Sequence, residues 1–309
     1  MPNFPLRVAA VTAVMLSCLA SYPAGAVYSA KVCRSLEQRY EQIERAATTV
    51  EVNAMLFSAA DKGCEALARS LLDQGASLEA RDRLGAKPLA RAAVAGQAEL
   101  VTLFLDKDAP IDAKNLEGST ALYQVAETGR LPIVRLLVER GANVNLPGRN
   151  GITPLSAAAY MGSVPLVEFL FEKGADPKAV DDTNKAALIY AAGRGFAPVV
   201  RLLLDHGVDV YARYGNDLTA LMWASGYSAE AGVNDAMEVM TLFLDRGARI
   251  EDQDNRGRTA LMIAAELNHE AAVDLLLARG ADKGLKDKQG KSAGDLTTLT
   301  ALREKLAGQ

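Results

Sequence analysis

The chain has 309 residues, of which 50% are hydrophobic and 23% are charged. This composition supports a packed core over most of the length and excludes intrinsic disorder as the main state. The 34 Lys and Arg against 38 Asp and Glu give a formal net charge of −4, which disfavours a nucleic-acid-binding protein because such proteins need a cationic face.

The N-terminal segment has the pattern of an export signal. Arg7 precedes an uncharged, mostly apolar run at 8–20, which is shorter than the roughly 20 residues that a membrane span needs. A helix breaker and the small-x-small triplet Ala24-Gly25-Ala26 follow. We therefore expect a signal peptide over 1–26, removed after Ala26. A short buried helix and a lipoprotein are the alternatives, although the residues before the cysteine of this segment do not resemble a lipobox.

Cleavage would leave two cysteines, Cys33 and Cys64, in the mature chain. It would also remove Arg7 and no acid, so 33 basic and 38 acidic residues would remain, a net charge of −5. In an exported protein, two cysteines predict a disulfide. Two buried thiols are the alternative. A metal site is disfavoured because no histidine lies near either cysteine in the sequence.

The segment at 27–51 predicts an amphipathic capping helix. Apolar residues fall on one helical face between charged ones, namely Leu36, Tyr40, Ile43 and Ala47. We expect this helix to lie over the segment that follows, with Cys33 pinned to Cys64.

A period of 33 residues organises the rest of the chain. Apolar triplets recur in steps of 33, 33, 33, 33 and 40, beginning at Lys87, Thr120, Thr153, Ala186, Thr219 and Thr259. Gly-Ala pairs such as Gly141-Ala142 recur at the same spacing, and so do glycines in the middle of the unit. Three landmarks in one register indicate true internal repeats.

Each landmark has a structural role. Threonines such as Thr153 can cap a helix by accepting a backbone N–H, and Pro154 fits a first helical turn. The glycine in the middle of the unit can end this first helix, because glycine adopts the left-handed conformation without strain. Apolar residues at helical spacing, as in Ile133, Val134 and Leu137, then predict a second helix. One such pair leaves a face unburied, so stability must come from stacking on neighbours.

The unit at 151–184 closely resembles the ankyrin repeat in its period and in its Thr-Pro-Leu and Gly-Ala-Asp landmarks. The resemblance extends over roughly 52–309 and implies an all-α solenoid of stacked helix-turn-helix units with β-turn or hairpin connections. It implies seven repeats over 52–289 and a partial repeat at 290–309 that caps the array. The histidine usual after Thr-Pro-Leu is replaced throughout, by Ala90, Tyr123, Ser156, Ile189, Met222 and Met262.

The step of 40 residues places an insertion around 228–234. Seven residues amount to about two helical turns, so the insertion could lengthen the first helix of its repeat. Alternatively, it forms a loop with Gly226 and Gly232 as joints.

Catalysis finds little support in the sequence. His206 and His269 occupy a helix end and a turn, where a structural role is expected. Neither a nucleophile motif nor a phosphate-binding glycine loop is present. The pair Asp181-Asp182 could perform acid–base chemistry, but carboxylates at a turn tip are usually solvated. We expect no enzyme, no cofactor and no metal site, and a carboxylate-dependent hydrolase is the alternative from another class.

Ankyrin proteins generally bind partner proteins through the turn tips and the inner face of the first helices. Carried over to this sequence, the resemblance implies a patch in the middle of the array, beside Arg83 and Glu117. Tyr190 and Trp223 follow the apolar pattern and are expected in the core, while Tyr123 could belong to either. The candidate binding residues are Arg149, Asn150, Ile152, Tyr160, Met161, Asp182, Lys185, Arg194, Tyr214, Leu218 and Tyr227.

The sequence therefore predicts a scaffold that holds a partner protein. The short alanine-rich leader favours a bacterial protein of the periplasm, and a secreted protein acting on host proteins is the alternative. We expect a monomer that binds no nucleic acid and has no membrane span in the mature chain.

Overall fold

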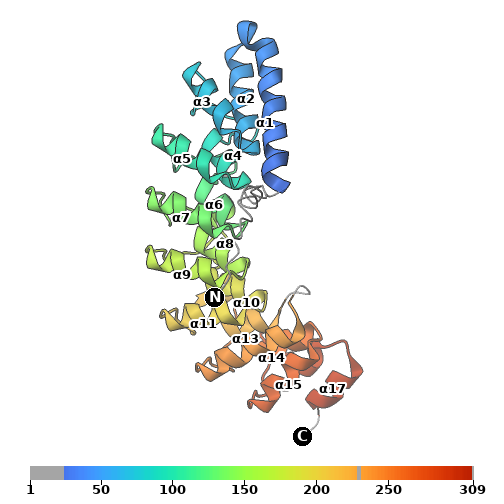
Figure 1. The fold of residues 1–309 in the computed structure, drawn as a ribbon. Coiled ribbons are helices and arrows are strands. Elements are labelled where there is room, and N and C mark those ends of the chain that lie inside the picture. The colour runs from blue at the N-terminus through green and yellow to red at the C-terminus, as the bar shows by residue number, and fades with distance from the viewer. Residues whose placement is uncertain (1–23, 228–230, 308–309) are drawn as a thin grey trace, which may run out of the picture.

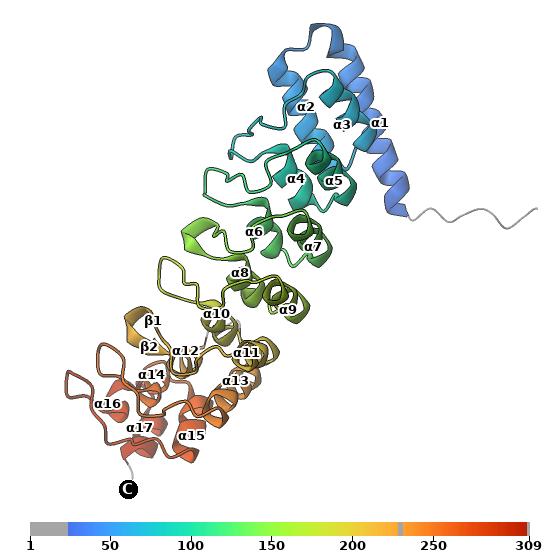
Figure 2. The same ribbon diagram turned by 90° about the vertical axis from the view of Figure 1, so that its left-hand side faces the viewer.

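The computed structural model describes residues 24–227 and 231–307. Figures 1 and 2 show helix pairs stacked one after another into a curved array. The predicted all-α solenoid is confirmed. Most of the predicted signal peptide, at 1–23, lies outside the described residues.

The array begins with α1 (Ala24–Ile43), the 3₁₀ turn η1 (Glu44–Ala46), α2 (Thr49–Lys62) and α3 (Glu65–Asp73). The prediction of a single capping helix over 27–51 is thus wrong at the C-terminal end of the helix, because α1 ends at Ile43 and α2 begins at Thr49. The chain turns after Ile43, because the side chain of Thr48 accepts a backbone N–H and begins a new helix in a capping box with Glu51.

Helix α1 packs along α2. Tyr40 is buried and donates a hydrogen bond to Gln74, and Leu36 packs partly buried against the core. Ile43, predicted on the same face, is 37% exposed. A disulfide joins Cys33 of α1 to Cys64, with 5.3 Å between their Cα atoms, as the sequence predicted.

Six further helix pairs and a short C-terminal pair follow. Their bounds are α4 (Pro88–Ala95), α5 (Ala98–Asp106), α6 (Ala121–Ala126), α7 (Leu131–Glu139), α8 (Pro154–Tyr160), α9 (Val164–Glu172), α10 (Ala187–Gly193), α11 (Ala197–Asp205), α12 (Ala220–Ser225), α13 (Val233–Asp245), α14 (Ala260–Glu266), α15 (Glu270–Ala278), α16 (Ala293–Leu296) and α17 (Thr300–Ala307). The predicted threonine caps are confirmed: the side chains of Thr120, Thr153, Thr219 and Thr259 each accept a backbone N–H.

The core lies between successive pairs. The inner helices α4, α6, α8, α10, α12 and α14 contact one another in order along the array, and the outer helices stack beside them. Leucines fill the space between the two layers, and Leu155, Leu170 and Leu188 are at most 1% exposed. This burial comes from neighbouring units, as expected for a stacked array.

The turns that join the repeats form a row along one edge of the array (Figure 2). In most of them an Asp or Asn side chain accepts the backbone N–H groups two and four residues later, at 2.8–3.0 Å. These residues are Asp82, Asn115, Asp181, Asp254 and Asp287. These side-chain hydrogen bonds hold the turns.

Two positions in this register depart from the pattern. Gly148 precedes the 3₁₀ turn η2 (Arg149–Gly151), in which Asn150 has a φ of +55°. Tyr214 belongs to β1 (Arg213–Tyr214), which pairs antiparallel with β2 (Leu218–Thr219) across the turn η3 (Gly215–Asp217). The turn backbone therefore follows a different course in these two repeats.

The insertion does not lengthen the first helix of its repeat, so that alternative is wrong. Helix α12 ends at Ser225 after six residues, and Gly226 caps it. Instead the second helix, α13, has 13 residues where α11 has nine, and it begins after Gly232. Residues 228–230, between the two glycines, lie outside the described part of the chain.

Candidate functional site

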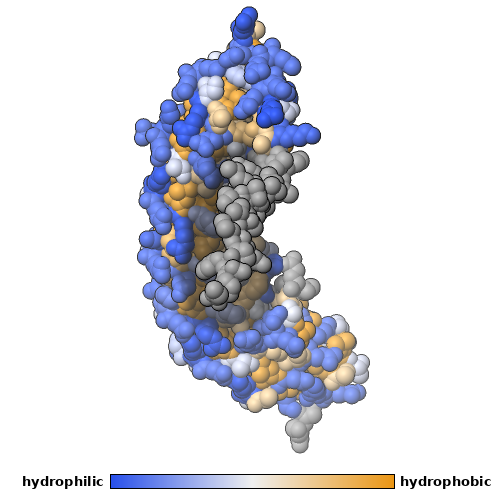
Figure 3. Space-filling model, in the orientation of Figure 1, coloured by the Kyte–Doolittle hydropathy of each residue, from blue (hydrophilic) through white to orange (hydrophobic). Residues whose placement is uncertain are grey.

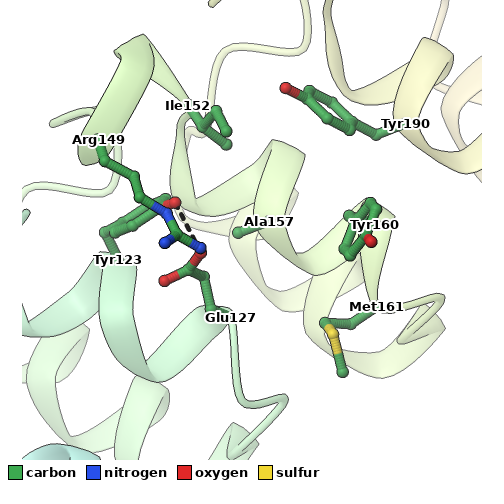
Figure 4. A pocket seen from close by; sticks show the side chains of 8 residues that line it. All are labelled: Tyr123, Glu127, Arg149, Ile152, Ala157, Tyr160, Met161 and Tyr190. Atoms are coloured by element: carbon green, nitrogen blue, oxygen red, sulfur yellow. Dashed lines mark hydrogen bonds and ion pairs between the residues drawn. The ribbon is translucent and has the colours of Figure 1, made fainter.

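A pocket of about 390 Å³ opens on the inner side of the array at its middle (Figure 4). Inner helices α6, α8 and α10 supply most of its walls, and the turn around η2 supplies the rest. We call it the tyrosine pocket. Its lining residues are Tyr123, Glu127, Arg149, Ile152, Ala157, Tyr160, Met161 and Tyr190.

The pocket exists because one position of the repeat is small. Ala157 is preceded by Gln124 and followed by Tyr190 at the 33-residue spacing. From the second repeat to the seventh this inner-helix position carries Arg91, Gln124, Ala157, Tyr190, Trp223 and Ile263. The alanine therefore leaves space between larger side chains on both sides.

Tyr123 forms one wall and depends on Gly148. The Tyr123 ring is fully buried, and a Cβ added at Gly148 would lie 2.1 Å from its Cδ1 atom. The ring thus occupies space next to a backbone position where most of the other turns carry Asp or Asn. The Tyr123 hydroxyl donates to Glu127 Oε1 at 2.8 Å, and Arg149 Nη2 lies 2.7 Å from the same oxygen.

The phenol of Tyr123 stays neutral at physiological pH. Burial, with the hydrogen bond to Glu127 adding to it, raises the pKa of Tyr123 to about 12, although Arg149 acts in the opposite direction. Burial likewise raises the pKa of Tyr190, whose hydroxyl donates to Asp181 Oδ2. The rings of Tyr123 and Tyr190 in the pocket wall are therefore uncharged, and the charged side chains of Glu127 and Arg149 are paired with each other.

Tyr160 stands at the mouth of the pocket and is 43% exposed. Its ring meets that of Tyr190 edge to face, with 6.1 Å between the centroids. The Arg194 guanidinium lies 4.5 Å from the Tyr160 ring centroid, and its Nη1 donates to the Tyr160 hydroxyl at 3.0 Å. These contacts hold the ring in one orientation beside Met161, which is 45% exposed.

A second hollow of about 580 Å³ adjoins the first and shares Glu127 with it. Helices α2, α4 and α6 and the turns at Leu84 and Asn115 line it, and we call it the neighbouring pocket. Together the two pockets make one groove along the inner helices. Figure 3 shows hydrophobic side chains along the inner side of the array and hydrophilic ones along its outer edge.

Five of the eleven predicted binding residues line the tyrosine pocket or contact its lining. Arg149, Ile152, Tyr160 and Met161 line it, and Arg194 lies against Tyr160.

Three other predicted residues lie nearby, at the tips and flanks of the turns. Asn150 and Asp182 are exposed at neighbouring turn tips, where the Asp182 N–H donates to the Asn150 carbonyl at 3.0 Å. Lys185 is half-buried, with its ammonium 5.2 Å from the Trp223 ring centroid.

Three predicted residues do not reach the pocket. Tyr214 is only 6% exposed, so its prediction as a binding residue is wrong; the hairpin turns its side chain into the core. Leu218 packs half-buried in β2. Tyr227 is half-buried and stacks on His269, with ring centroids 4.0 Å apart.

Sequence reasoning missed Glu127 and Ala157 and placed Tyr190 in the core, whereas Tyr190 is half-buried and lines the pocket. It left Tyr123 undecided. Two signals could have found them, both read by comparing equivalent positions of the repeats. One is the small residue at 157 between Gln124 and Tyr190, and the other is Gly148 at a position that most of the other repeats fill with Asp or Asn.

Asp181 and Asp182, the pair considered for catalysis, were expected to be solvated, but only one of them is exposed to solvent. Asp182 is exposed, but Asp181 is 8% exposed and accepts hydrogen bonds from Tyr190, Thr183 and the Lys185 N–H. Burial raises the pKa of Asp181, but these hydrogen bonds outweigh it and hold the pKa below its usual value. Asp181 thus serves the turn as a bound carboxylate.

The two histidines make structural contacts, as predicted. His206 follows α11 and stacks on Phe171, with centroids 4.5 Å apart, and His269 Nδ1 lies 3.0 Å from the Ser225 carbonyl oxygen. Among residues 24–227 and 231–307, His, Cys, Asp and Glu side chains do not gather into a group that could hold a metal ion. In the same residues no helix is both long enough and apolar enough to span a membrane.

Comparison with known proteins agrees with the repeat architecture. The chain matches the family described as ankyrin repeats (3 copies) over residues 89–181, 174–235 and 216–287. It is similar in fold to the crystal structure of the human ASB11 ankyrin repeat domain, at 24% sequence identity and a TM-score of 0.63. That similarity covers 72% of this chain and 96% of the ASB11 domain.

Proposed function

The chain belongs to the ankyrin-repeat family, and on that premise we propose that it is a non-enzymatic scaffold that holds a partner protein in its groove. Ankyrin repeats indicate a protein-interaction domain. The partner would lie across the tyrosine pocket and touch the neighbouring turn tips at Asn150 and Asp182.

One observation carries this proposal: exposed tyrosine and methionine side chains line a pre-formed pocket at the middle of the array. Tyr160 and Met161 are 43% and 45% exposed although both are large and apolar over most of their surface. Tyr and Arg are enriched at the energetic centres of protein interfaces. Contacts with Tyr190 and Arg194 already order Tyr160, so a partner would spend little free energy on immobilising it.

We also propose that the protein is exported and acts in the bacterial periplasm. The signal-like segment at 1–26 supports this location. The Cys33–Cys64 disulfide supports it as well, because disulfides persist in oxidising compartments. Intact-mass measurement of the purified protein should give a chain beginning at Val27, and recovery from the medium instead of the periplasm would favour a secreted protein.

The binding function is tested by crosslinking and capture with the protein expressed from its full sequence. A groove variant, Tyr160→Glu with Met161→Glu, places two carboxylates at the mouth of the tyrosine pocket. The matched control is Tyr211→Glu with Val233→Glu, because these residues are 44% and 49% exposed, do not line the pocket and lie outside the turns at Asn150 and Asp182.

A partner captured by the wild type and the control but lost with the groove variant is the expected result. Equal capture by all three proteins would place the binding surface elsewhere on the array. Loss with both variants would point to a surface that runs along the turns, and it would contradict a site centred on the pocket.

A further inference from the structure

The polar side chains of the tyrosine pocket are already paired inside the protein. Glu127 accepts from Tyr123 and pairs with Arg149, the Tyr160 hydroxyl accepts from Arg194, and Tyr190 donates to Asp181. A ligand therefore meets ring faces, the Met161 side chain and the Ile152 side chain. Such a surface favours a ligand segment that buries carbon atoms and brings few backbone N–H groups needing partners.

The turns beside the pocket do not favour strand addition. The Asp182 N–H donates to the Asn150 carbonyl at 3.0 Å, and the Gly215 N–H donates to the Asn184 carbonyl at 3.0 Å. The Leu116 N–H donates to the Leu84 carbonyl in the same way. These bonds use backbone groups that an added strand would need.

One end of the groove, at the neighbouring pocket, presents a carboxylate that is not paired within the protein, and we call it the acidic end. Three carboxylates and two cations line this pocket, namely Asp61, Glu117 and Glu127 with Lys62 and Arg91, and of these Glu127 is already paired with Arg149. Arg91 is itself shared between Asp61 and Asp82. The exposed carboxylate of Glu117 has no hydrogen-bond or ion-pair partner among the described residues.

From these observations we propose that the groove binds an extended, proline-rich segment of a partner protein, with a Lys or Arg beside Glu117 and prolines in the tyrosine pocket. The inference rests on the proposed binding function and names its ligand. Proline has no N–H to satisfy, and a polyproline II helix is pre-formed and docks on aromatic-lined grooves. The basic flank complements the acidic end.

The length of the groove sets the length of the ligand. The two pockets span inner helices α2 to α10, which is four helix-to-helix steps. At roughly 8–10 Å a step this is about 32–40 Å. A polyproline II segment rises about 3.1 Å per residue, so a peptide of about 12 residues covers it.

The test measures fluorescence anisotropy with labelled synthetic peptides of about 12 residues and the protein expressed from its full sequence. The probe has Pro at every third position and two Lys at one end. Three further peptides replace Pro by Ala, replace Lys by Glu, or form an amphipathic helix of the same charge.

Two pairs of protein variants accompany the peptides. Ala157→Gln fills the pocket with the residue that the chain carries at the equivalent position 124, whereas Ala157→Ser leaves it open. Glu117→Lys reverses the charge at the acidic end, and Glu99→Lys makes the same change at an exposed position of outer helix α5.

We expect the proline probe to bind at least about tenfold more tightly than its alanine version. In Ala157→Gln the Kd for the proline probe should rise at least about tenfold while the thermal transition of the protein stays unchanged. In Ala157→Ser the Kd should stay within about twofold of the wild-type value. Glu117→Lys should weaken binding of the probe with Lys and strengthen binding of the peptide in which Glu replaces Lys. Glu99→Lys should change the affinity for neither peptide.

Several results would overturn the inference. If the helical peptide binds more tightly than the proline probe and is lost in Ala157→Gln, the groove is a binding site but its ligand is a helix. If the proline probe binds Ala157→Gln as well as the wild type, its site is not this pocket. If no peptide binds at concentrations up to about 1 mM, the ligand class is wrong, and the capture experiment decides the proposed function separately.

Discussion

The substitution Gly148→Ala tests whether Tyr123 has its place because position 148 lacks a side chain. A Cβ there would lie 2.1, 2.3 and 2.4 Å from three carbon atoms of the Tyr123 ring, where favourable carbon contacts are about 3.5–4.0 Å. The ring is fully buried and tied to Glu127 through its hydroxyl. It cannot yield without breaking that hydrogen bond. We expect a loss of about 1–3 kcal/mol in the free energy of unfolding.

A double-mutant cycle isolates the cause. Tyr123→Ala alone should cost about 3–5 kcal/mol by emptying the site. In that background, adding Gly148→Ala should cost less than about 0.5 kcal/mol, because the clash has gone. The free energies come from guanidinium unfolding followed by circular dichroism. Gly193→Ala is the control, since an added Cβ there meets nothing within 4 Å.

An equal cost of Gly148→Ala in both backgrounds would refute this reasoning. The glycine would then be required by the backbone of the turn, whose φ at Gly148 is −93°, and not by the tyrosine. A loss with Gly193→Ala as large as that with Gly148→Ala would show that the array responds to any such change. The link between the pocket and the altered turn would then have no support.

Three further outcomes follow from the fold. Reducing the Cys33–Cys64 disulfide, which closes a separation of 31 residues, should lower stability by about 3–4 kcal/mol, and two free thiols in the unreduced, unfolded protein would contradict the bond. Leu170→Asp buries a carboxylate at a position with 0% exposure and should lower the thermal transition strongly, whereas the exposed Glu168→Asp should not. Because the folded pKa of Asp181 is depressed, its stabilisation is complete above the unfolded pKa of about 3.9. It is lost as the pH falls through the folded value, so the deficit of Asp181→Asn should shrink in acid denaturation curves.

The scaffold could be predicted from the sequence because each of its devices is local. A threonine cap such as Thr153 and a leucine such as Leu155 have the same role in whichever repeat they occur. Because the pattern recurs at a fixed spacing, a structural assignment made in one repeat can be checked at the equivalent positions of the others. The end of α1 escaped this reasoning, because helical periodicity continued past Ile43 while the cap at Thr48 began a new helix.

The site was only partly predictable because it depends on pairs of residues from different repeats. Arg149, Ile152, Tyr160 and Met161 followed from the family's binding positions. The partnership of Tyr123 with Gly148 spans 25 residues and becomes visible only when the turn is compared with its neighbours. Tyr214 shows the opposite case: it occupies a turn position, but the hairpin directs its side chain into the core.

The two departures that build the tyrosine pocket have different energetic consequences. Ala157 is itself buried, at 4% exposure, and its small side chain leaves the space of the pocket between Gln124 and Tyr190. Gly148 gives up the side-chain hydrogen bonds that hold most of the other turns, and the buried Tyr123 ring with its Glu127 and Arg149 partners takes their place. The turn at 148–152 is therefore held by residues that also form the pocket wall. A partner seated in the pocket would press on the same residues, so binding should stabilise this turn more than any other in the array.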